Sequence, residues 1–372
     1  MRRDVLITGG AGFVGSHLCD ELLRAGHRVR VLDSLEPQVH GPARTRPAHL
    51  DPDVELLVGD VRDARAVRRA LRGVHAVYHL AAAVGVGQSM YEVARYTAVN
   101  NLGTAVLLEA LVDRPVERLV VASSMSIYGE GLYRDADGRL VGDATRTPKQ
   151  LGAGDWDVRA ADGRPLSPVP TPETKQPALA SVYALSKYDQ ERLCLLIGQA
   201  YGIPTVALRF FNVYGTRQAL SNPYTGVLAI FASRLLNGNA PAIFEDGRQR
   251  RDLVHVHDVA RACHLALDAP GAPGQVLNVG SGQSVTIREV AERLAAVLGR
   301  EYLTPTLTGK YRVGDIRNCF AHIGRAREVL GYAPQVRMED GLLELAVWLE
   351  GQTAEDRVAQ ASQELARRGL TV

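Results

Sequence analysis

A tyrosine and a lysine four residues apart, Tyr183 and Lys187, lie in the stretch SVYALSKYDQ, which has the pattern of a helix. Side chains at this spacing leave a helix on the same face one turn apart, so the phenol and the ammonium would be neighbours. A free phenol has a pKa of about 10 and is a poor base at neutral pH. A neighbouring positive charge favours the phenolate, so the pair predicts a general base whose pKa is brought toward the working range.

A glycine-rich turn near the N-terminus predicts a dinucleotide site. In VLITGGAGFVGSHL, Gly10, Gly12 and Gly15 follow an apolar run and open a helical pattern. Glycines at this spacing allow a tight turn and close approach of the backbone to a pyrophosphate, while the helix N-terminus supplies amides and a positive dipole. Asp33 ends the next apolar run, where its carboxylate would accept hydrogen bonds from the adenosine ribose and repel a 2′-phosphate. The pattern therefore favours NAD over NADP.

The elements that would position these groups are short apolar runs separated by helical patterns. Strands without polar alternation are typical of a parallel sheet that is covered on both faces. The runs lie at residues 5–8, 28–33, 54–60, 76–81, 118–124 and 205–210. The expected fold is α/β, with a doubly wound parallel sheet of the Rossmann type over residues 1–213.

The rest of the chain divides into three expected segments. Residues 131–172 are rich in Gly, Pro, Asp and Arg and lack periodicity, which predicts a long irregular insertion over the active-site edge. Residues 214–350 predict a smaller mixed α/β domain that binds substrate, with parts packing back on the first domain. Residues 351–372 form a polar, helix-prone tail. Within 214–350 we expect helices near 224–237, 258–268, 286–299 and 339–349 and strands near 242–244 and 276–279.

Composition is that of a soluble globular protein, with 46% hydrophobic and 23% charged residues. The net charge of +2 gives no reason to expect a nucleic acid or an anionic membrane as partner. The four cysteines are far apart in the chain, so we expect no disulfide framework, no metal site and a cytoplasmic location. No apolar run approaches the about 20 residues that a membrane helix needs.

Several motifs together resemble the extended short-chain dehydrogenase/reductase family, and within it the nucleotide-sugar epimerases and dehydratases. They are the glycine turn, the serines at 123 and 124, IYG at 127–129, Tyr183-x-x-x-Lys187 and RFFNVYG at 209–215. The resemblance covers about residues 4–349. It implies NAD as cofactor, a nucleotide-diphosphate sugar as substrate, and a homodimer formed through helices near 89–112 and 181–201.

The resemblance also implies roles for individual residues. Ser124 would hydrogen-bond the reacting sugar hydroxyl and complete a catalytic set with Tyr183 and Lys187. The implied substrate contacts are Ser124, Ser126, Asn212, Arg251 and Arg312, and an arginine fork suits a diphosphate well. The expected cofactor contacts are Gly9, Gly12, Phe13, Val14, Asp33, Asp60, Val61, Leu80, Ala81, Ala82, Asn100, Tyr183 and Lys187.

The two residues after Ser124 narrow the chemistry. The family's 4,6-dehydratases carry an Asp-Glu pair there, because elimination of water needs a base for the C5 proton and an acid for the leaving hydroxyl. Here the positions hold Met125 and Ser126, and Ser126 also replaces the glutamate of the family's UDP-glucuronate decarboxylases. The remaining chemistry is oxidation at C4 followed by return of the hydride, which is 4-epimerisation.

The motifs indicate the reaction more specifically than they indicate the sugar or the nucleotide of the substrate. Residues 36–41, 127–133 and 221–231 and the insertion resemble dTDP-L-rhamnose 4-epimerases, but the insertion lacks the cysteine pair of those relatives. UDP-glucose or UDP-glucuronate 4-epimerases are the alternative. Two other classes remain: a 4-ketoreductase, which Asp33 disfavours, and a non-catalytic NAD-binding protein, which the intact catalytic set disfavours.

Overall fold

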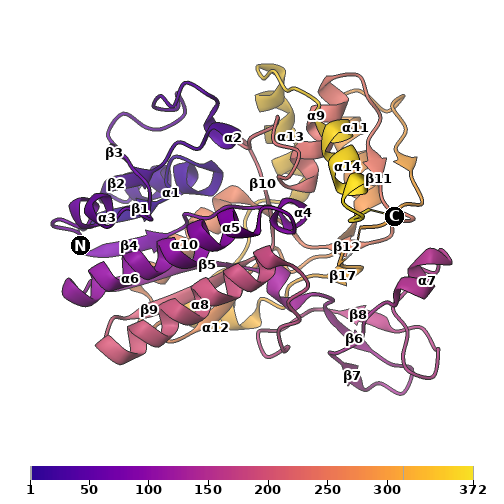
Figure 1. The fold of residues 1–372 in the computed structure, drawn as a ribbon, viewed down its shortest axis with the longest axis horizontal. Helices are drawn as coiled ribbons and strands as arrows, with labels where there is room; N and C mark the ends of the chain where they lie inside the picture. The colour runs from indigo at the N-terminus through magenta and orange to yellow at the C-terminus, as the bar shows by residue number, and fades with distance from the viewer. Residues whose placement is uncertain (1, 313, 372) are drawn as a thin grey trace.

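Seven parallel strands form the central sheet of the computed structural model, which describes residues 2–312 and 314–371 (Figure 1). The strand order is β3-β2-β1-β4-β5-β9-β14, so the chain builds outward from β1 on one side and from β4 on the other. The strands are β1 Asp4–Thr8, β2 Arg28–Asp33, β3 Glu55–Val58, β4 Ala76–His79, β5 Arg118–Ser124, β9 Thr205–Phe210 and β14 Val276–Val279. The predicted doubly wound parallel sheet is confirmed.

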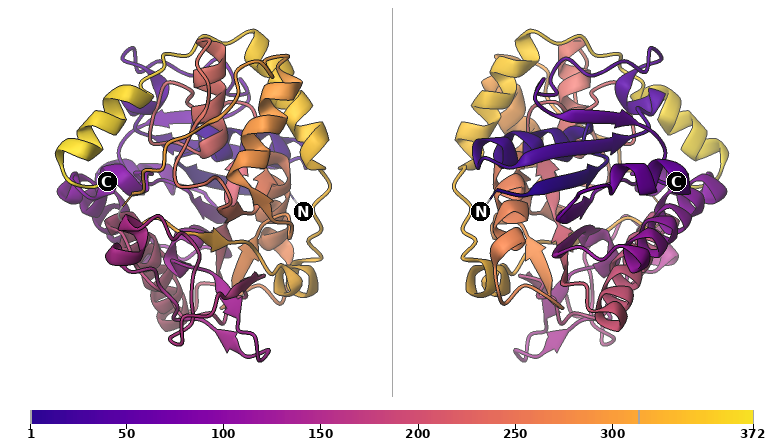
Figure 2. Two further views of the ribbon diagram at one scale, coloured as in Figure 1. Left: turned by 90° about the vertical axis from the view of Figure 1, so that its right-hand side faces the viewer. Right: turned by 90° about the vertical axis from the view of Figure 1, so that its left-hand side faces the viewer.

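Helices cover both faces of the sheet. Successive strand residues point to opposite sides, and because both sets are apolar, both faces must be buried. Val5 and Ile7 pack toward α1, α10 and α12, whereas Leu6 packs toward α3, α6 and α8. Figure 2 shows the strands between these two helical layers. The helices are α1 Phe13–Arg24, α3 Ala64–Ala70, α6 Gly103–Asp113, α8 Val182–Tyr201, α10 Val256–Asp268 and α12 Gly324–Leu330.

The chain after residue 214 contributes both to the Rossmann sheet and to a separate group of helices. β14, α10 and α12 join the central sheet and one of its faces, while α9, α11 and α13 pack together around a separate apolar cluster. These last helices are α9 Val227–Leu236, α11 Ile287–Val297 and α13 Met338–Glu350. The four helices predicted from 224 onward are all present. The predicted strand near 276–279 is also present, as an edge strand of the central sheet.

Short elements connect these parts. Two-stranded pairs are formed by β10 (Asn212–Tyr214) with β13 (Leu253–His255) and by β11 (Ala242–Ile243) with β16 (Thr306–Leu307). A three-stranded sheet contains β15 (Val285–Thr286), β12 (Arg250–Arg251) and β17 (Asn318–Cys319). The remaining short helices near the crevice are α2 Pro37–His40, α4 Val86–Ser89, α5 Val93–Tyr96, the π-helix η1 Thr97–Leu102 and the 3₁₀ helix η2 Met125–Tyr128.

The insertion at 131–172 is folded, so the expectation of an irregular loop is wrong. It contains an antiparallel sheet of β6 (Leu132–Arg134), β7 (Leu140–Val141) and β8 (Ser167–Val169). The helix α7 (Pro148–Gly152) lies between β7 and β8 in the chain and at the outer edge of the molecule in Figure 1. A small apolar cluster of Tyr133, Val158 and Leu166 lies beneath it. Strands of two or three residues are too short to produce a periodic pattern, which is why the sequence did not reveal them.

Buried ion pairs attach the insertion to the rest of the protein. The guanidinium of Arg317, 2% exposed, donates to Glu245 at 3.0 Å and to Asp157 of the insertion at 3.1 Å. Arg146, also in the insertion, donates to the other oxygen of Glu245 at 2.7 Å and to the carbonyl of Asp315 at 2.9 Å. Burial raises the pKa of the Glu245 carboxyl although both arginines oppose it. The attachment therefore depends on keeping both cations in place.

Replacing Arg317 with alanine is expected to lower the free energy of unfolding by about 3–5 kcal/mol, because it removes a partner from a buried charge. Thermal and denaturant unfolding would measure the change. The matched control is Arg337→Ala, whose side chain is 73% exposed and pairs with Asp340, with an expected loss of at most about 1 kcal/mol. Equal midpoints for the two variants would show that the ion pairs do not hold the insertion.

The polar tail forms the helix α14 (Val358–Arg367), in agreement with its helix-prone sequence. Across residues 2–312 and 314–371, none of the helices combines the length and the apolar character needed to cross a membrane.

Candidate active site

The glycine turn lies between the carboxyl end of β1 and the start of α1. A Cβ on Gly10 would stand 2.4 Å from Val31, and one on Gly15 would stand 2.5 Å from the carbonyl oxygen of Gly9. Only glycine fits at these two positions, because backbone and sheet approach too closely for a side chain. Gly12 is the N-cap of α1, and Phe13 and Val14 form its first turn, so amides of this turn face a ligand without an intervening side chain.

Asp33 lies at the end of β2, as predicted. Its two oxygens accept hydrogen bonds from the backbone N–H groups of Ala11 and Leu35 at 3.0 and 2.9 Å. These bonds hold the carboxylate beside the glycine turn while each oxygen keeps a free lone pair for ribose hydroxyls. The residues present therefore fit the adenosine half of NAD.

The other expected cofactor residues follow β3 and β4 at the same edge of the sheet, and they differ in their contacts. Leu80, Ala81 and Ala82 follow β4, and a Cβ on Gly9 would stand 2.9 Å from Ala81, so this loop touches the turn. Val61 is buried, whereas the Asp60 carboxylate pairs with Arg62 at 2.6 Å. An adenine contact by Asp60 would therefore compete with its own arginine.

Asn100 connects two walls of the crevice. Its amide accepts from the backbone N–H of Ala83 at 2.7 Å and donates to the Ala83 carbonyl and to Ser186. The side chain is fully buried in the π-helix η1. These contacts place Asn100 as a residue that positions the β4 loop against α8 rather than one whose amide is open to the cofactor.

Tyr183 lies in the first turn of α8, beside the end of β5. The Ser181 hydroxyl caps the helix by accepting from Ala184, and the backbone N–H of Tyr183 donates to Ser89 at 3.0 Å. The Ser124 hydroxyl lowers the pKa of Tyr183, but burial raises it more. The two predicted catalytic oxygens are thus brought together.

Burial and Ser124 set the pKa shift of Tyr183 in the structure, and the effect of Lys187 together with a nicotinamide ring stays a prediction. The Lys187 ammonium donates to Gln190 at 2.7 Å, and burial lowers its own pKa to about 8. The net shift of the Tyr183 pKa is upward because desolvation disfavours the phenolate.

A buried polar network beneath the catalytic helix was not found from the sequence. Gln190 donates to Thr104 at 2.9 Å, and the His79 ring bridges Thr8 and Thr104 at 2.8 Å on each side. This network fixes the Gln190 amide that accepts from Lys187. A glutamine one turn after a predicted catalytic lysine was the available signal.

Of the two residues that follow Ser124, Ser126 makes contact with the Ser124 side chain. Met125 is buried, and the Ser126 hydroxyl donates to the Ser124 hydroxyl at 2.9 Å while the Ser126 backbone N–H lies 3.2 Å from it. Ser124 therefore caps η2 and also faces Tyr183. Ser126 orients Ser124 in this structure.

The two predicted diphosphate arginines converge on a carboxylate that the sequence did not single out. Arg312 donates to Asp315 at 3.0 Å, and Arg251 lies 3.8 Å from the other Asp315 oxygen while it donates to backbone carbonyls. Burial raises the pKa of Asp315, but the two arginines outweigh it and the net shift is downward. The cluster holds two cations on the substrate side of the crevice.

Asn212 has a buried acceptor that suits a ligand donor. Its Oδ1 is buried and, among the residues described, has no hydrogen-bond partner. A buried amide oxygen without a partner is unfavourable, so a donor from a ligand would complete it. The position agrees with the substrate contact predicted for Asn212.

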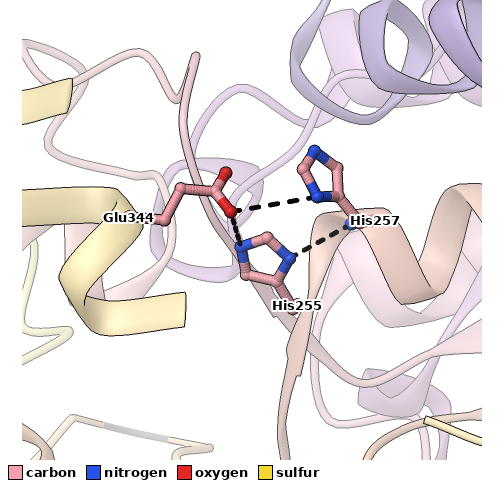
Figure 3. A group of neighbouring side chains, drawn as sticks. All are labelled: His255, His257 and Glu344. Atoms are coloured by element: carbon pink, nitrogen blue, oxygen red, sulfur yellow. Dashed lines mark hydrogen bonds and ion pairs between the residues drawn. The ribbon is translucent and has the colours of Figure 1, made fainter. Parts of the chain in front are cut away.

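Three side chains outside the expected site come close enough to suggest a cation site. Ligand atoms of His255, His257 and Glu344 lie within 4.8 Å of one another, and His255 Nε2 lies 3.7 Å from Glu344 (Figure 3). The His257 backbone N–H donates to His255 Nδ1, so a neutral ring carries its proton on Nε2, the atom that a metal would need. His255 is also the N-cap of α10, where the helix dipole opposes a cation. The absence of a metal site stays a prediction.

Hydride chemistry needs a dinucleotide and a base next to it, and this crevice provides for both at the carboxyl ends of a Rossmann sheet. Such an arrangement defines a dinucleotide-dependent enzyme of the short-chain dehydrogenase/reductase type. The chain belongs to the NAD-dependent epimerase/dehydratase family, whose model matches residues 5–148 and 160–280, and NAD is its cofactor.

Known relatives cover nearly the whole chain. A dTDP-L-rhamnose 4-epimerase of Burkholderia thailandensis is 36% identical over 93% of this chain and 95% of its own length. The UDP-glucose 4-epimerase of Thermus thermophilus in complex with NAD is 32% identical, with a TM-score of 0.73 over 95% of this chain and 100% of that one. The UDP-glucuronic acid 4-epimerase of Bacillus cereus in complex with UDP-glucuronic acid and NAD is 26% identical, with a TM-score of 0.75 over 93% and 99%.

Replacing Asp33 with alanine is expected to weaken NAD binding by at least about tenfold, because charged hydrogen bonds contribute about 1.5–3 kcal/mol each. NAD content after dialysis and the dissociation constant of NAD would be measured. The control is Asp53→Ala, which removes an exposed carboxylate before β3 that is not among the expected cofactor contacts. Equal NAD retention by both variants would contradict the role of Asp33.

Proposed function

We propose that the protein catalyses NAD-dependent 4-epimerisation of a nucleotide-diphosphate sugar, most specifically dTDP-L-rhamnose or a related dTDP-6-deoxyhexose. The observation that supports the reaction is the placement of Tyr183 in the first turn of α8 and of Ser124 at the end of β5, with Met125 and Ser126 in place of further acids or bases. The sugar assignment is supported by the dTDP-L-rhamnose 4-epimerase relative at 36% identity.

In the proposed mechanism, Tyr183 removes the proton of the C4 hydroxyl and later returns one to the C4 oxygen. Ser124 positions that hydroxyl, and Ser126 orients Ser124 by donating to it. Lys187 keeps a positive charge one helical turn below the phenol. Bound NAD supplies the hydride acceptor and a positive ring that opposes the raised pKa of Tyr183.

The protein must hold the nucleotide firmly and the hexose loosely. A 4-keto sugar that takes the hydride back on its other face has to turn relative to the cofactor, so the strong contacts belong on the diphosphate. Arg251, Arg312 and Asn212 would provide them, with Asp315 keeping the two arginines together. This separates a rigid nucleotide end from a less constrained sugar end.

Three other functions can be distinguished from this one. A UDP-glucose or UDP-glucuronate 4-epimerase would use the same catalytic residues with another sugar, and the two structural relatives described above carry those names. A 4-ketoreductase would exchange its dinucleotide in every cycle, and a scaffold would need no base. NAD released by heat in a one-to-one ratio with the chain supports epimerisation, whereas an empty site supports the reductase or the scaffold.

Replacing Tyr183 with phenylalanine is expected to reduce turnover by about two or more decades, the usual contribution of a positioned proton-transfer group. Inversion at C4 would be followed by NMR with a panel of dTDP- and UDP-sugars and no added cofactor. Tyr188→Phe, at the other partly exposed tyrosine of the same helix stretch, is the control and is expected to stay within a few-fold of wild type. Turnover by Tyr183→Phe at the level of the control would refute the catalytic assignment.

We also infer a homodimer formed through α8 and the helices around α6. Leu185 and Leu196 are 47% and 53% exposed and lie three turns apart on one face of α8, while Leu102 beside α6 is 53% exposed. Apolar side chains on neighbouring helices of this kind are typical of an interface between two copies of a chain.

Replacing Leu185 and Leu196 together with glutamate is expected to convert a dimer into a monomer, because each copy would place charges against its partner. Light scattering after size exclusion would give the mass. Leu343→Glu, at a leucine 55% exposed on α13, should leave the mass unchanged. A wild-type monomer, or a dimer that survives the double change, would contradict this interface.

A further inference from the structure

The C-terminal segment, residues 351–371, crosses from the substrate-side helices back to the expected diphosphate site. Near its start, the Asp356 carboxylate accepts from Asn239 at 2.8 Å, just after α9. Helix α14 follows. Near its end, Thr371 pairs with Arg312 in an isolated antiparallel bridge. Both ends of the segment are thus attached on the substrate side of the crevice.

Between these ends, α14 rests on the loop and helix that follow β4. Leu365 is 7% exposed and covers Gly87, where a Cβ would stand 3.2 Å from the leucine Cδ2. The guanidinium of Arg368 lies 4.3 Å from the centre of the Tyr91 ring. Figure 2 shows the yellow end of the chain beside the purple segment that carries these residues. Apolar burial and a cation over an aromatic face both favour this contact.

The helix α4, on which α14 packs, contacts the catalytic helix α8 at Tyr183. Ser89, at the end of α4, accepts the backbone N–H of Tyr183 at 3.0 Å, and Gly87 lies in the same short helix. Tyr91 donates to the Tyr224 hydroxyl at 2.6 Å, which joins this part of the chain to the loop before α9. The tail therefore lies over the junction between the Rossmann side and the substrate side.

The first residues of the tail line a cavity beside α2. Gln352, Thr353 and Arg357 line a cavity of about 410 Å³ together with α2 and residues 218–222. Helix α2 begins four residues after Asp33. Ligands of this fold bind outside the carboxyl ends of the strands, and the tail runs on this side from the cavity beside α2 to Arg312.

We propose that residues 351–371 form a strap that closes the nucleotide-sugar crevice and retains the substrate between the two hydride transfers. The proposal rests on the proposed function and names an element of its site that holds the nucleotide-diphosphate sugar. The strap binds no reacting atom. It acts by slowing release, because a ligand under it leaves only after Leu365 and Arg368 separate from the β4 side.

Retention matters because the sugar is oxidised halfway through the cycle. Removal of a proton from the C4 hydroxyl and of a hydride from C4 leaves a 4-keto sugar, a reduced nicotinamide and a proton on the base. Return of both restores the starting cofactor. A 4-keto sugar that escapes leaves the enzyme with a reduced nicotinamide and no oxidant, so each escape inactivates one site.

The test uses the full-length holoenzyme and two matched pairs of variants in α14. Leu365→Asp removes the buried contact, and Ala366→Asp places the same charge on the exposed neighbouring residue. Arg368→Ala removes the cation over Tyr91, and Arg367→Ala removes an arginine that is 72% exposed and pairs with Glu364. Release of a fluorescent dTDP or UDP analogue is measured by competition, and reduced nicotinamide is followed by its absorbance during turnover.

We expect nucleotide release to be at least about tenfold faster in Leu365→Asp and about two- to fivefold faster in Arg368→Ala, with both controls at the wild-type rate. Reduced nicotinamide should accumulate in the same order. Equal release rates in all four variants would overturn the strap. A lower kcat with unchanged release would also overturn it, since the tail would then only support Tyr183 through α4. If no nucleotide sugar is epimerised by wild type, the proposed function fails, while the nucleotide release rates still decide for or against the strap.

Discussion

Helix α8 buries a lysine, a glutamine and a glutamate against the sheet, and the rest of the site depends on that contact. Lys187 donates to Gln190, and Arg209 donates to both oxygens of Glu191 at 2.9 and 2.7 Å. A buried charge that lost its partner would be strongly destabilising, so the helix cannot slide or rotate on the sheet. Tyr183, one turn before Lys187, is thereby held at the end of β5.

The same burial that fixes the catalytic helix also sets a chemical requirement. Desolvation raises the pKa of Tyr183 and lowers that of Lys187 to about 8, so the protein alone keeps the phenol protonated. A positively charged nicotinamide ring near the phenol would favour the phenolate. In the proposed mechanism, base catalysis by Tyr183 would therefore depend on bound NAD, which suits an enzyme that keeps its dinucleotide through the whole cycle.

On the other side of the crevice, Asp315 performs a comparable organising role. It neutralises Arg251 and Arg312, and its carbonyl accepts from Arg146 of the insertion. The insertion, the substrate-side arginines and the end of the tail at Thr371 consequently meet in one region. This explains how segments of low periodicity at 131–172 and 351–371 take part in a site that the regular elements only begin to define.

Local pattern by itself determined the sheet, the glycine turn, Asp33 and the spacing of Tyr183 and Lys187, because each depends on residues close in the chain or on the two-residue period of a buried strand. Tertiary structure decided the rest. The direction of the Tyr183 pKa shift depends on burial, and the partners Gln190, Asp315 and Arg146 depend on contacts between distant segments. The fold of the insertion escaped prediction because strands of two or three residues have no periodic signal. The helix of the tail was expected, but its course was not, because its position follows from packing against distant segments that sequence spacing does not encode.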